Sequence, residues 1–237
     1  MKISIVIPAH NEEANLPSLV DSLVQLGESQ KWDYEIVIGD DHSADSTGRI
    51  ADEYSKKNPR ITVIHRRNSI RGMGNTLKEA TKAATGDVII WTMADKSDAL
   101  ETYPLMVAKI NDGYDLVFGA RYIKGGSKGD LASHKAFSSQ TYSRIAGFIF
   151  GMKVHDITNA FRAFRKAVFD SIELESGDFA ISPEFAIKAH LLGYRLGEVP
   201  TTYSDRKAGK TTFKIMKMGL RYGSLFKYRF MPVKKKQ

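Results

Sequence analysis

Short apolar runs rich in β-branched residues alternate with longer amphipathic stretches along the N-terminal part of the chain. The short runs predict buried strands, and the longer stretches predict helices because their apolar side chains recur at helical spacing. The predicted strands are Ile3–Ile7, Tyr34–Ile38, Ile61–His65 and Asp87–Thr92, and the predicted helices are Glu12–Leu26, Ala44–Lys57 and Gly72–Ala84. This alternation is typical of an α/β fold in which helices cover both faces of a mostly parallel sheet.

The remainder of the chain continues with the same two kinds of segment. The predicted strands are Tyr114–Gly119, Ala160–Phe164 and Arg195–Val199, and the predicted helices are Glu101–Ile110, Leu131–Gly151 and Pro183–Leu192. No internal repeat or linker interrupts the pattern, so we expect one domain over residues 1–210. A basic amphipathic helix and tail are predicted for residues 211–237.

The composition narrows the classes of partner and chemistry. With 237 residues, 42% of them hydrophobic, the chain can bury one large core. The net charge of +8 favours nucleotides, lipid phosphates, anionic membranes or nucleic acid as partners. Because cysteine is absent, disulfides, thiol catalysis and thiolate metal sites are excluded. The sequence has no signal-peptide core and no apolar run long enough to span a bilayer, so we expect a cytoplasmic location.

Acidic side chains follow several of the predicted strands. They are Glu12, Asp40, Asp41, Asp95 and Asp98. Ligands bind beyond the carboxyl ends of parallel strands, so we expect these groups to share a crevice with residues 66–74. Carboxylates there can accept hydrogen bonds from ribose or base groups and can hold a hard cation that carries a diphosphate. Each acid alone could equally cap a helix, but their succession along the strand ends favours a ligand site.

Several longer segments carry a family resemblance. ISIVIPAHNEE, EIVIGDDHSADST and RGMGNTLKEATKAATGDVIIWTMAD resemble, in order, three signatures of family 2 glycosyltransferases. GARYIKGG, DITNAFRAFRK, SPEFAIKA and EVPTTYSDRKAGKTTF resemble the subgroup similar to dolichol-phosphate mannose synthase. The resemblance implies a GT-A fold and an inverting transferase that uses a nucleotide-sugar donor with Mg²⁺ or Mn²⁺.

The resemblance also implies a role for individual residues. Pro8, His10 and Glu12 would border the nucleotide base, Asp40 and Asp41 would lie near base and ribose, and Arg121, Arg206 and Lys210 would face anionic phosphates. His10 stands where the subgroup often has an aromatic residue, and its imidazole could stack on the base. A helix-entry role for His10 and solvent exposure of Arg206 and Lys210 are the alternatives.

The metal motif departs from the family pattern. Asp95 would be the metal ligand, but Met93 occupies the position of the usual first aspartate of Asp-x-Asp. A thioether is a poor ligand for Mg²⁺ or Mn²⁺, which bind oxygen. We expect Asp98 to supply the second carboxylate, with the Ser97 hydroxyl or water. The alternative is a weakly held metal in a nucleotide-sugar binder without turnover.

The acceptor decides whether a general base is needed. The resemblance implies a polyprenyl phosphate acceptor, and a phosphate is already anionic near neutral pH. A sugar hydroxyl, as in polysaccharide or glycolipid assembly, would need a base, and Asp156 is the candidate. Asp156 and Arg162 lie in the matched segment DITNAFR and are therefore expected near the acceptor. The alternative for Asp156 is a structural cap or a partner for Arg162.

The C-terminal residues bear on membrane association. A basic series runs at helical spacing through Lys210, Lys214, Lys217 and Arg221. An apolar series runs beside it through Phe213, Met216 and Leu220. A largely aromatic tail follows, with Phe226, Tyr228, Phe230 and Met231. This pattern suits a helix lying on the cytoplasmic face of an anionic membrane, or an attachment through a membrane-protein partner. An ordinary surface helix packed on the core is the alternative. Nucleic acid is not expected as a partner, because no aromatic-basic RNA motif accompanies the charge.

Overall fold

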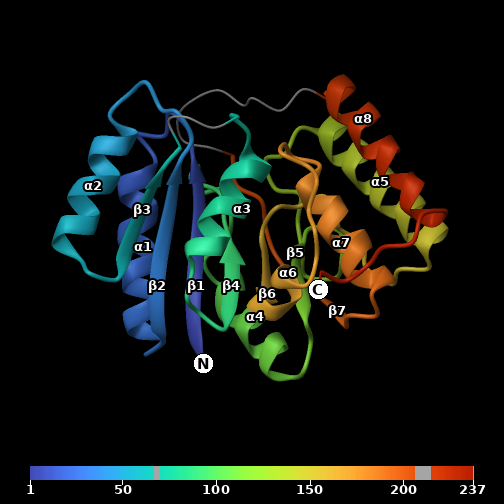
Figure 1. Cartoon of the computed structure of the whole chain (residues 1–237), viewed down its shortest axis with the longest axis horizontal. Helices are drawn as coiled ribbons and strands as arrows, with labels where there is room; N and C mark the ends of the chain where they lie inside the picture. The colour runs from blue at the N-terminus through green and yellow to red at the C-terminus, as the bar shows by residue number, and fades with distance from the viewer. Residues whose placement is uncertain (67–69, 206–214, 237) are drawn as a thin grey trace.

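The computed structural model describes residues 1–66, 70–205 and 215–236, with the side chains of residues 215–217 left aside. Its centre is a seven-stranded sheet with the order β3-β2-β1-β4-β6-β5-β7 (Figure 1). The strands are β1 (Lys2–Ala9), β2 (Asp33–Asp40), β3 (Ile61–His65), β4 (Val88–Trp91), β5 (Leu116–Ala120), β6 (Arg162–Arg165) and β7 (Leu196–Pro200). The mostly parallel α/β sheet expected from the sequence is confirmed.

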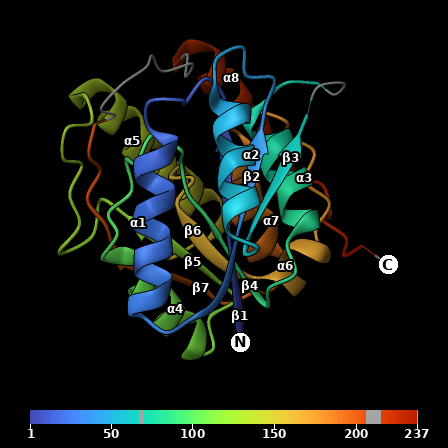
Figure 2. The same cartoon turned by 90° about the vertical axis from the view of Figure 1, so that its left-hand side faces the viewer.

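Helices cover both faces of this sheet (Figure 2). One face carries α1 (Leu16–Ser29), α2 (Thr47–Lys57) and α4 (Thr102–Asn111). The other carries α3 (Met73–Ala83), α5 (Ser133–Phe150), α6 (Lys166–Asp170), α7 (Ile181–Leu191), α8 (Ile215–Ser224) and the 3₁₀ helix η1 (Leu225–Arg229). The interior strand β1 is buried over Ile3–Ala9, so it contributes side chains to both cores, as its nearly continuous apolar run predicts.

The helix after β1 begins later than the sequence pattern predicts. α1 starts at Leu16 with Pro17 in its first turn, where proline is tolerated because no intrahelical donor is needed there. Residues 11–15 instead form a turn in which Asn11 has a φ of 54°. This turn keeps Glu12 at the edge of the sheet rather than inside a helix.

Strand β6 runs against its neighbours. It pairs antiparallel with both β4 and β5, while β5 and β7 pair in parallel. The chain therefore enters β6 from the loop that follows α5, at the edge of the sheet where the parallel strands end. This reversal brings residues 156–160 to the same edge as the ends of β1, β2 and β4.

The C-terminal segment is part of the main core where the structure describes it. Met218, Tyr222, Leu225 and Tyr228 are buried in the cluster that includes α5 and α7. Phe226 stacks on Tyr142 of α5 at 5.6 Å between ring centroids. The described part of the helix and tail predicted over 211–237 thus packs onto the domain, because its aromatic residues complete the core.

Candidate active site

A first cavity of about 450 Å³ opens where β1, β2 and β4 end. Of the residues predicted to bind the nucleotide sugar or metal, it is lined by Pro8, His10, Glu12, Asp41 and Asp95. The strand ends that form it are locally strained: Asn11, His42 and Lys96, which follow β1, β2 and β4, all have φ between 54° and 58°. Non-glycine residues adopt such angles at a cost, and they cluster at functional sites.

Asp41 is held in place by a buried arginine and a glycine turn. Its carboxylate accepts hydrogen bonds from the Arg66 guanidinium and, at 2.8 Å, from the Gly72 backbone N–H. Arg66 is buried and also pairs with Glu79 of α3. A side chain at Gly72 would meet the carbonyl oxygen of Gly177 at 2.2 Å, so glycine is required there. The result is a preorganised acidic wall of the first cavity.

His10 is oriented by two hydrogen bonds on opposite sides of its ring. Nδ1 lies 2.7 Å from the Asp41 carbonyl oxygen, and Nε2 faces the Arg71 guanidinium. Because the guanidinium can only donate, Nε2 is the acceptor and the ring proton lies on Nδ1. The ring is therefore fixed at the rim of the first cavity, as a platform beside Arg71.

Asp40 lies behind the cavity wall rather than in it. It is buried, accepts a hydrogen bond from the Ser43 N–H at 3.2 Å, and lies 3.0 Å from His65 Nδ1. His65 Nε2 lies 2.9 Å from Asp52 on α2. The hydrogen bond to Asp52 makes the largest contribution and that to Asp40 the next largest. Together they raise the pKa of His65, although burial by itself would lower it. Asp40 thus anchors the turn that carries Asp41.

Raising the pH from about 6 to about 9 is expected to remove the stability contributed by His65. Its pKa is higher in the folded chain than in the unfolded one, so this contribution is complete below about 6.5 and is lost as the pH rises through the folded value. Urea unfolding across this range should show a steeper fall for the wild type than for His65→Gln. Parallel profiles for the two proteins would contradict the prediction.

Asp95 lines both the first cavity and a second one, whereas Asp98 lines neither. One Asp95 oxygen accepts from the Ser97 N–H at 3.2 Å. Asp98 Oδ2 accepts hydrogen bonds from the Thr92 hydroxyl at 2.9 Å and from the Met93 N–H at 3.0 Å. Burial raises the pKa of Asp98 to about 7. Asp98 therefore braces the turn after β4, and the predicted pairing of Asp95 with Asp98 on one metal gains no geometric support.

The donor set at Asp95 still suits a hard cation. Mg²⁺ in nucleotide enzymes is held by one or two carboxylates together with substrate phosphates and water. Asp95 supplies such a carboxylate at the mouth of both cavities, while Met93 adds no suitable ligand. Among the described residues no group of three acidic or histidine side chains forms a complete protein-only metal site. A metal here would depend on a diphosphate for its remaining ligands.

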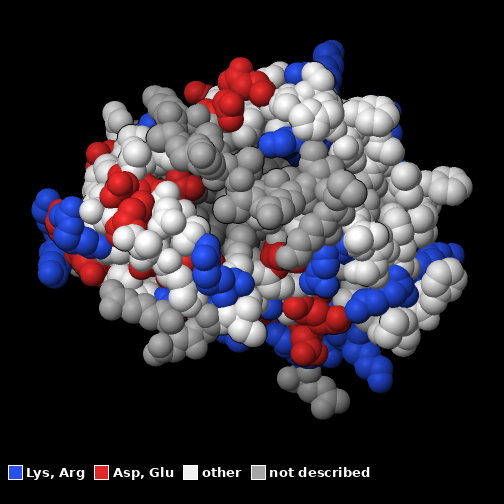
Figure 3. Space-filling model, turned by 90° about the horizontal axis from the view of Figure 1, so that it is seen from above, with Lys and Arg blue, Asp and Glu red and all other residues white. Residues whose placement is uncertain are grey.

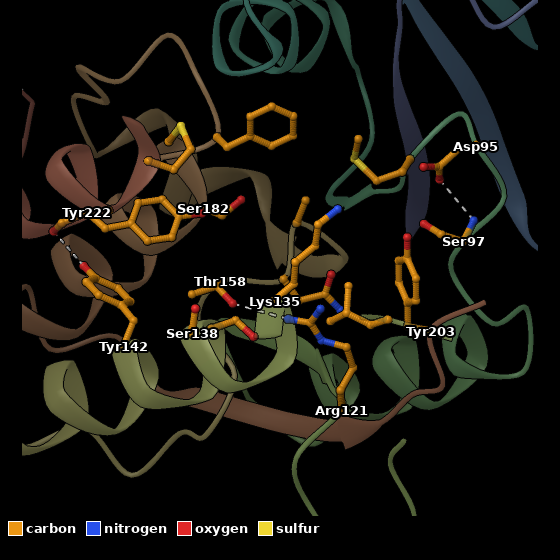
Figure 4. Close-up of a pocket in the computed structure, with 18 residues that line it drawn as sticks. Asp95, Ser97, Arg121, Lys135, Ser138, Tyr142, Thr158, Ser182, Tyr203 and Tyr222 are labelled. Carbon is orange, nitrogen blue, oxygen red and sulfur yellow. Dashed lines mark hydrogen bonds between the residues drawn. The ribbon is translucent and has the colours of Figure 1, made fainter. Parts of the chain in front are cut away.

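The second cavity, of about 250 Å³, adjoins the first and shares Met93, Asp95 and Phe179 with it. Figure 4 shows Asp95, Ser97 and Tyr203 at one end, Tyr142 and Tyr222 at the other, and Arg121 and Lys135 between them. One end is therefore charged and polar, and the end between α5 and α8 is aromatic. Such a cavity fits an amphipathic ligand.

Arg121 is bound to Asp156 in a buried pair. Asp156 accepts from Arg121 Nε at 2.7 Å, from its Nη2 at 2.9 Å and from its backbone N–H at 3.0 Å. Although burial opposes the charge, Asp156 raises the pKa of Arg121 above its usual value. Arg121 lines the second cavity and Asp156 does not. Asp156 therefore positions Arg121 and has no open path to an acceptor proton, and its partner is Arg121 rather than Arg162.

Arg162 is fully buried and bonds to main-chain carbonyl groups. It donates to Ser182 O at 2.7 Å and to the carbonyls of Ile157 and Asn159, and its guanidinium lies over the rings of Trp91 and Phe118. Burial lowers its pKa to about 9. Since it lines neither cavity, its described contacts support the 157–160 loop, and its predicted catalytic role stays a prediction.

Arg206 and Lys210, predicted to face the donor phosphates, lie outside the described residues. The structure instead brings in groups that sequence reasoning missed: Arg71, Lys135, Tyr142, Phe179 and Tyr222. Arg71 could have been predicted as a site residue, because it falls within the 66–74 loop that was expected in the crevice. Tyr142 and Tyr222 follow the spacing of ordinary helix cores, and Phe179 lies in a turn with no motif, so the sequence does not indicate their place in the site.

The loop that carries Phe179 is tied to two other parts of the molecule. The Asn75 N–H at the start of α3 donates to Gly177 O at 3.1 Å, and Arg221 of α8 pairs with Asp178 at 3.0 Å. Glu184 accepts from the N–H groups of Glu175 and Ser176 at 2.8 Å each. The wall between the two cavities is thereby fixed to both α3 and α8.

An α/β sheet with a polar cavity at its carboxyl edge, joined to an amphipathic one, is typical of α/β proteins that bind ligands beyond the carboxyl ends of their strands. Residues 4–173 match the family described as "Glycosyl transferase family 2". The chain belongs to this family, as its sequence signatures predicted.

Two curated relatives cover most of the chain. A dolichol-phosphate mannosyltransferase from Pyrococcus furiosus is 34% identical over 90% of this chain. A polyprenol monophosphomannose synthase from Mycolicibacterium smegmatis is 29% identical over 92% of this chain and 86% of its own length. The chain spans 60% of the length of the Pyrococcus protein.

Solved structures confirm the GT-A fold. Glucosyl-3-phosphoglycerate synthase from Mycobacterium tuberculosis, in complex with Mn²⁺ and UDP-glucose, superposes with a TM-score of 0.73 and 18% identity, over 96% of this chain and 78% of that one. The same enzyme with Mg²⁺ and UDP gives a TM-score of 0.67, over 94% of this chain and 76% of that one. Among the described residues, no helix is both long and apolar enough to cross a bilayer.

Proposed function

We propose that this chain transfers a sugar from a nucleotide-sugar donor to a polyprenyl phosphate, with inversion at the anomeric carbon. The observation that carries the proposal is the meeting of a polar cavity and an amphipathic cavity at Met93, Asp95 and Phe179. A sugar held at this junction would have its nucleotide on one side and its acceptor on the other. The names of the two curated relatives favour mannose as the sugar.

The first cavity suits the donor nucleotide. Asp41 and Glu12 offer acceptors for ribose hydroxyl or base N–H groups, and the fixed His10 ring offers a stacking surface. Arg71 adds a positive charge to the lining of this cavity, which suits an anionic ligand. Arg206 and Lys210 remain proposed phosphate contacts on the strength of the resemblance.

Asp95 would hold Mg²⁺ or Mn²⁺ together with the donor diphosphate, and Asp98 would brace the turn that presents Asp95. When bound, the metal supplies positive charge that stabilises the nucleoside diphosphate as it leaves. The solved glucosyl-3-phosphoglycerate synthase complexes contain Mn²⁺ or Mg²⁺ with UDP, which supports this choice of cation.

The second cavity suits a lipid phosphate. Arg121 and Lys135 provide cationic groups for the phosphate, and Tyr142, Met218 and Tyr222 provide an apolar surface for the first prenyl units. Ser182 also lines this cavity, although its hydroxyl oxygen is buried in the protein.

The chemistry of the step also favours phosphate over a sugar hydroxyl. An acceptor phosphate oxygen would attack the anomeric carbon, while the bond from that carbon to the donor diphosphate breaks and the diphosphate takes the electron pair. A hydroxyl would have to lose a proton as well. Among the described residues lining the second cavity, Asp95 is the one carboxylate, and Asp156 is turned away to Arg121. If Asp95 holds the metal, no other described carboxylate of this cavity is in place to act as a base for a hydroxyl acceptor.

The direct test is transfer of radiolabelled sugar from a panel of nucleotide sugars to a short-chain, water-soluble prenyl phosphate. We expect a product that mild acid cleaves back to the free sugar, formed only with added Mg²⁺ or Mn²⁺. Transfer to sugar hydroxyls but not to the prenyl phosphate would move the assignment to glycan assembly. Tight nucleoside diphosphate binding without any transfer would indicate a binding protein.

A lipid acceptor implies that the chain works at a membrane surface. We propose peripheral association with the cytoplasmic face, directly or through a membrane-protein partner. The absence of acidic residues from the C-terminal segment 215–236 supports this proposal.

A further inference from the structure

Helix α5 carries a stripe of large apolar residues that face solvent. The exposed fractions are 72% for Phe137, 46% for Ile145 and 91% for Phe148. Their spacing places them on one side of the helix, whereas Ala146 and Phe150 face the core. Solvent exposure of two phenylalanines on one helix face is unusual for a surface that contacts only water.

Helix α8 lies beside α5 and shows the same feature. Tyr142 of α5 contacts Tyr222 of α8, with 4.9 Å between ring centroids and a hydrogen bond from its hydroxyl to the Tyr222 carbonyl at 3.0 Å. Leu220, on the side of α8 away from buried Met218 and Tyr222, is 82% exposed. The two helices occupy the same end of the molecule (Figure 1), so their outer sides form one surface, here called the α5–α8 face.

The charges around the α5–α8 face have one sign. Residues 131–153 and 215–236 contain no aspartate or glutamate. Arg144 and Lys153 are exposed on and after α5, and Arg229 is exposed at the end of η1. Figure 3 shows this end of the molecule, at the right, with mainly white and blue side chains. Two acidic groups that contact α8 and η1, Asp178 and Glu175, are paired with Arg221 and Lys227.

The inner sides of the same helices line the second cavity. Lys135, Ser138 and Tyr142 of α5 and Met218, Gly219 and Tyr222 of α8 contribute to its wall. A surface that held the outer sides of α5 and α8 would therefore stand next to the cavity that suits the prenyl phosphate.

We infer that the α5–α8 face docks on an anionic lipid bilayer, with Phe137, Ile145, Phe148 and Leu220 entering the interface and the surrounding basic residues contacting lipid phosphates. A second copy of this chain would place two positive surfaces together, whereas an anionic bilayer complements both the apolar stripe and its charge. The reason for docking, access to a lipid acceptor, rests on the proposed function. The apolar and basic character of the α5–α8 face does not depend on it. Of the C-terminal series predicted to lie on the membrane, Leu220 belongs to this face and Tyr228 is instead buried.

The test is sedimentation of the full chain with vesicles of phosphatidylcholine, with and without phosphatidylglycerol. We expect the wild type to bind the mixed vesicles, and binding by the Ile145→Ser, Phe148→Ser double variant to fall by about tenfold or more. Serine removes apolar area without adding charge. Leu105→Ser is the matched control, since Leu105 is 46% exposed like Ile145 but lies on α4, across the sheet. We expect this control to bind as the wild type does.

Three results would overturn the inference. They are equal vesicle binding by the double variant and the wild type, no vesicle binding by the wild type, and a wild-type dimer in gel filtration that the double variant dissociates. Transfer to the short-chain prenyl phosphate separates this inference from the proposed function, because that acceptor needs no bilayer. If the wild type makes no such transfer but its vesicle binding depends on Ile145 and Phe148, the proposed function fails and the docking surface stands.

Discussion

Replacing Asp95 by alanine is expected to reduce metal-dependent sugar transfer by about a hundredfold or more, the loss typical when one charge-stabilising group is removed from an active site. Asp95 is the carboxylate common to both cavities, so no neighbouring side chain can take over its place beside the diphosphate. The fold should remain, because Asp95 lines the two cavities at the edge of the sheet and is not part of the apolar core. Initial rates over a range of Mn²⁺ concentrations and the circular dichroism spectrum would measure both effects. Activity near that of the wild type would remove the metal role from Asp95.

The matched substitution is Asp98→Asn. Asparagine at this position retains an oxygen that can accept from the Thr92 hydroxyl and the Met93 N–H. If Asp98 only braces the turn, the Asp98→Asn variant should lose at least tenfold less activity than Asp95→Ala. The reason is that the substitution weakens a hydrogen bond by about 1 kcal/mol or less. An equal loss, together with a raised Mn²⁺ requirement, would restore Asp98 as a second metal ligand.

Replacing Asp156 by alanine is expected to destabilise the fold by about 3–5 kcal/mol, the cost of leaving a buried charge without its partner. Asp156 is fully buried, and Arg121, which is 8% exposed, directs two side-chain nitrogens at it. The ordinary pKa of arginine lies far above neutral, so without Asp156 the Arg121 guanidinium still stays charged and cannot escape the penalty by losing its proton. Urea unfolding at neutral pH would measure the change.

Asp170→Ala provides the control for this prediction. Asp170 pairs with Lys166 at 2.8 Å one helical turn away, but it is half exposed, and such surface pairs contribute at most about 0.5 kcal/mol. A similarly small loss of stability for Asp156→Ala would show that the Arg121–Asp156 pair does not stabilise the fold. If Asp156→Asn keeps most of the stability but loses transfer, the orientation of Arg121 in the second cavity is what the pair secures.

The motif at the end of β4 shows which site residues can be assigned from local sequence and which cannot. The run Met93, Ala94, Asp95 after an apolar strand was enough to place Asp95 at the edge of the sheet, and the structure places it there. The next acid, Asp98, is equally close in sequence but turns back to Thr92 and Met93. Which way a side chain points within a turn depends on the backbone angles of that turn, including the positive φ of Lys96, and spacing does not encode them.

The C-terminal helix shows the same limit for packing. Its sequence has apolar residues on more than one side, and the sequence pattern favoured Leu220 and the aromatic tail as one membrane-facing series. In the structure Met218, Tyr222 and Tyr228 fill the core, while Leu220 faces outward. A helix with two apolar sides does not indicate which one the domain will bury; the shape of the surface left by α5 and α7 decides it.

The sequence by itself determined the order of the strands and of the longer helices, the sheet edge at which the site lies, and the family, while the short helix α6 was missed. Hydrophobic period and strand-end motifs are local properties of the chain. Only the tertiary structure decided that β6 runs antiparallel, that Asp156 pairs with Arg121, and that α5 and α8 frame the second cavity. Each of these depends on contacts between residues far apart in the chain. Such contacts are selected by the packing of the whole domain rather than by any one segment.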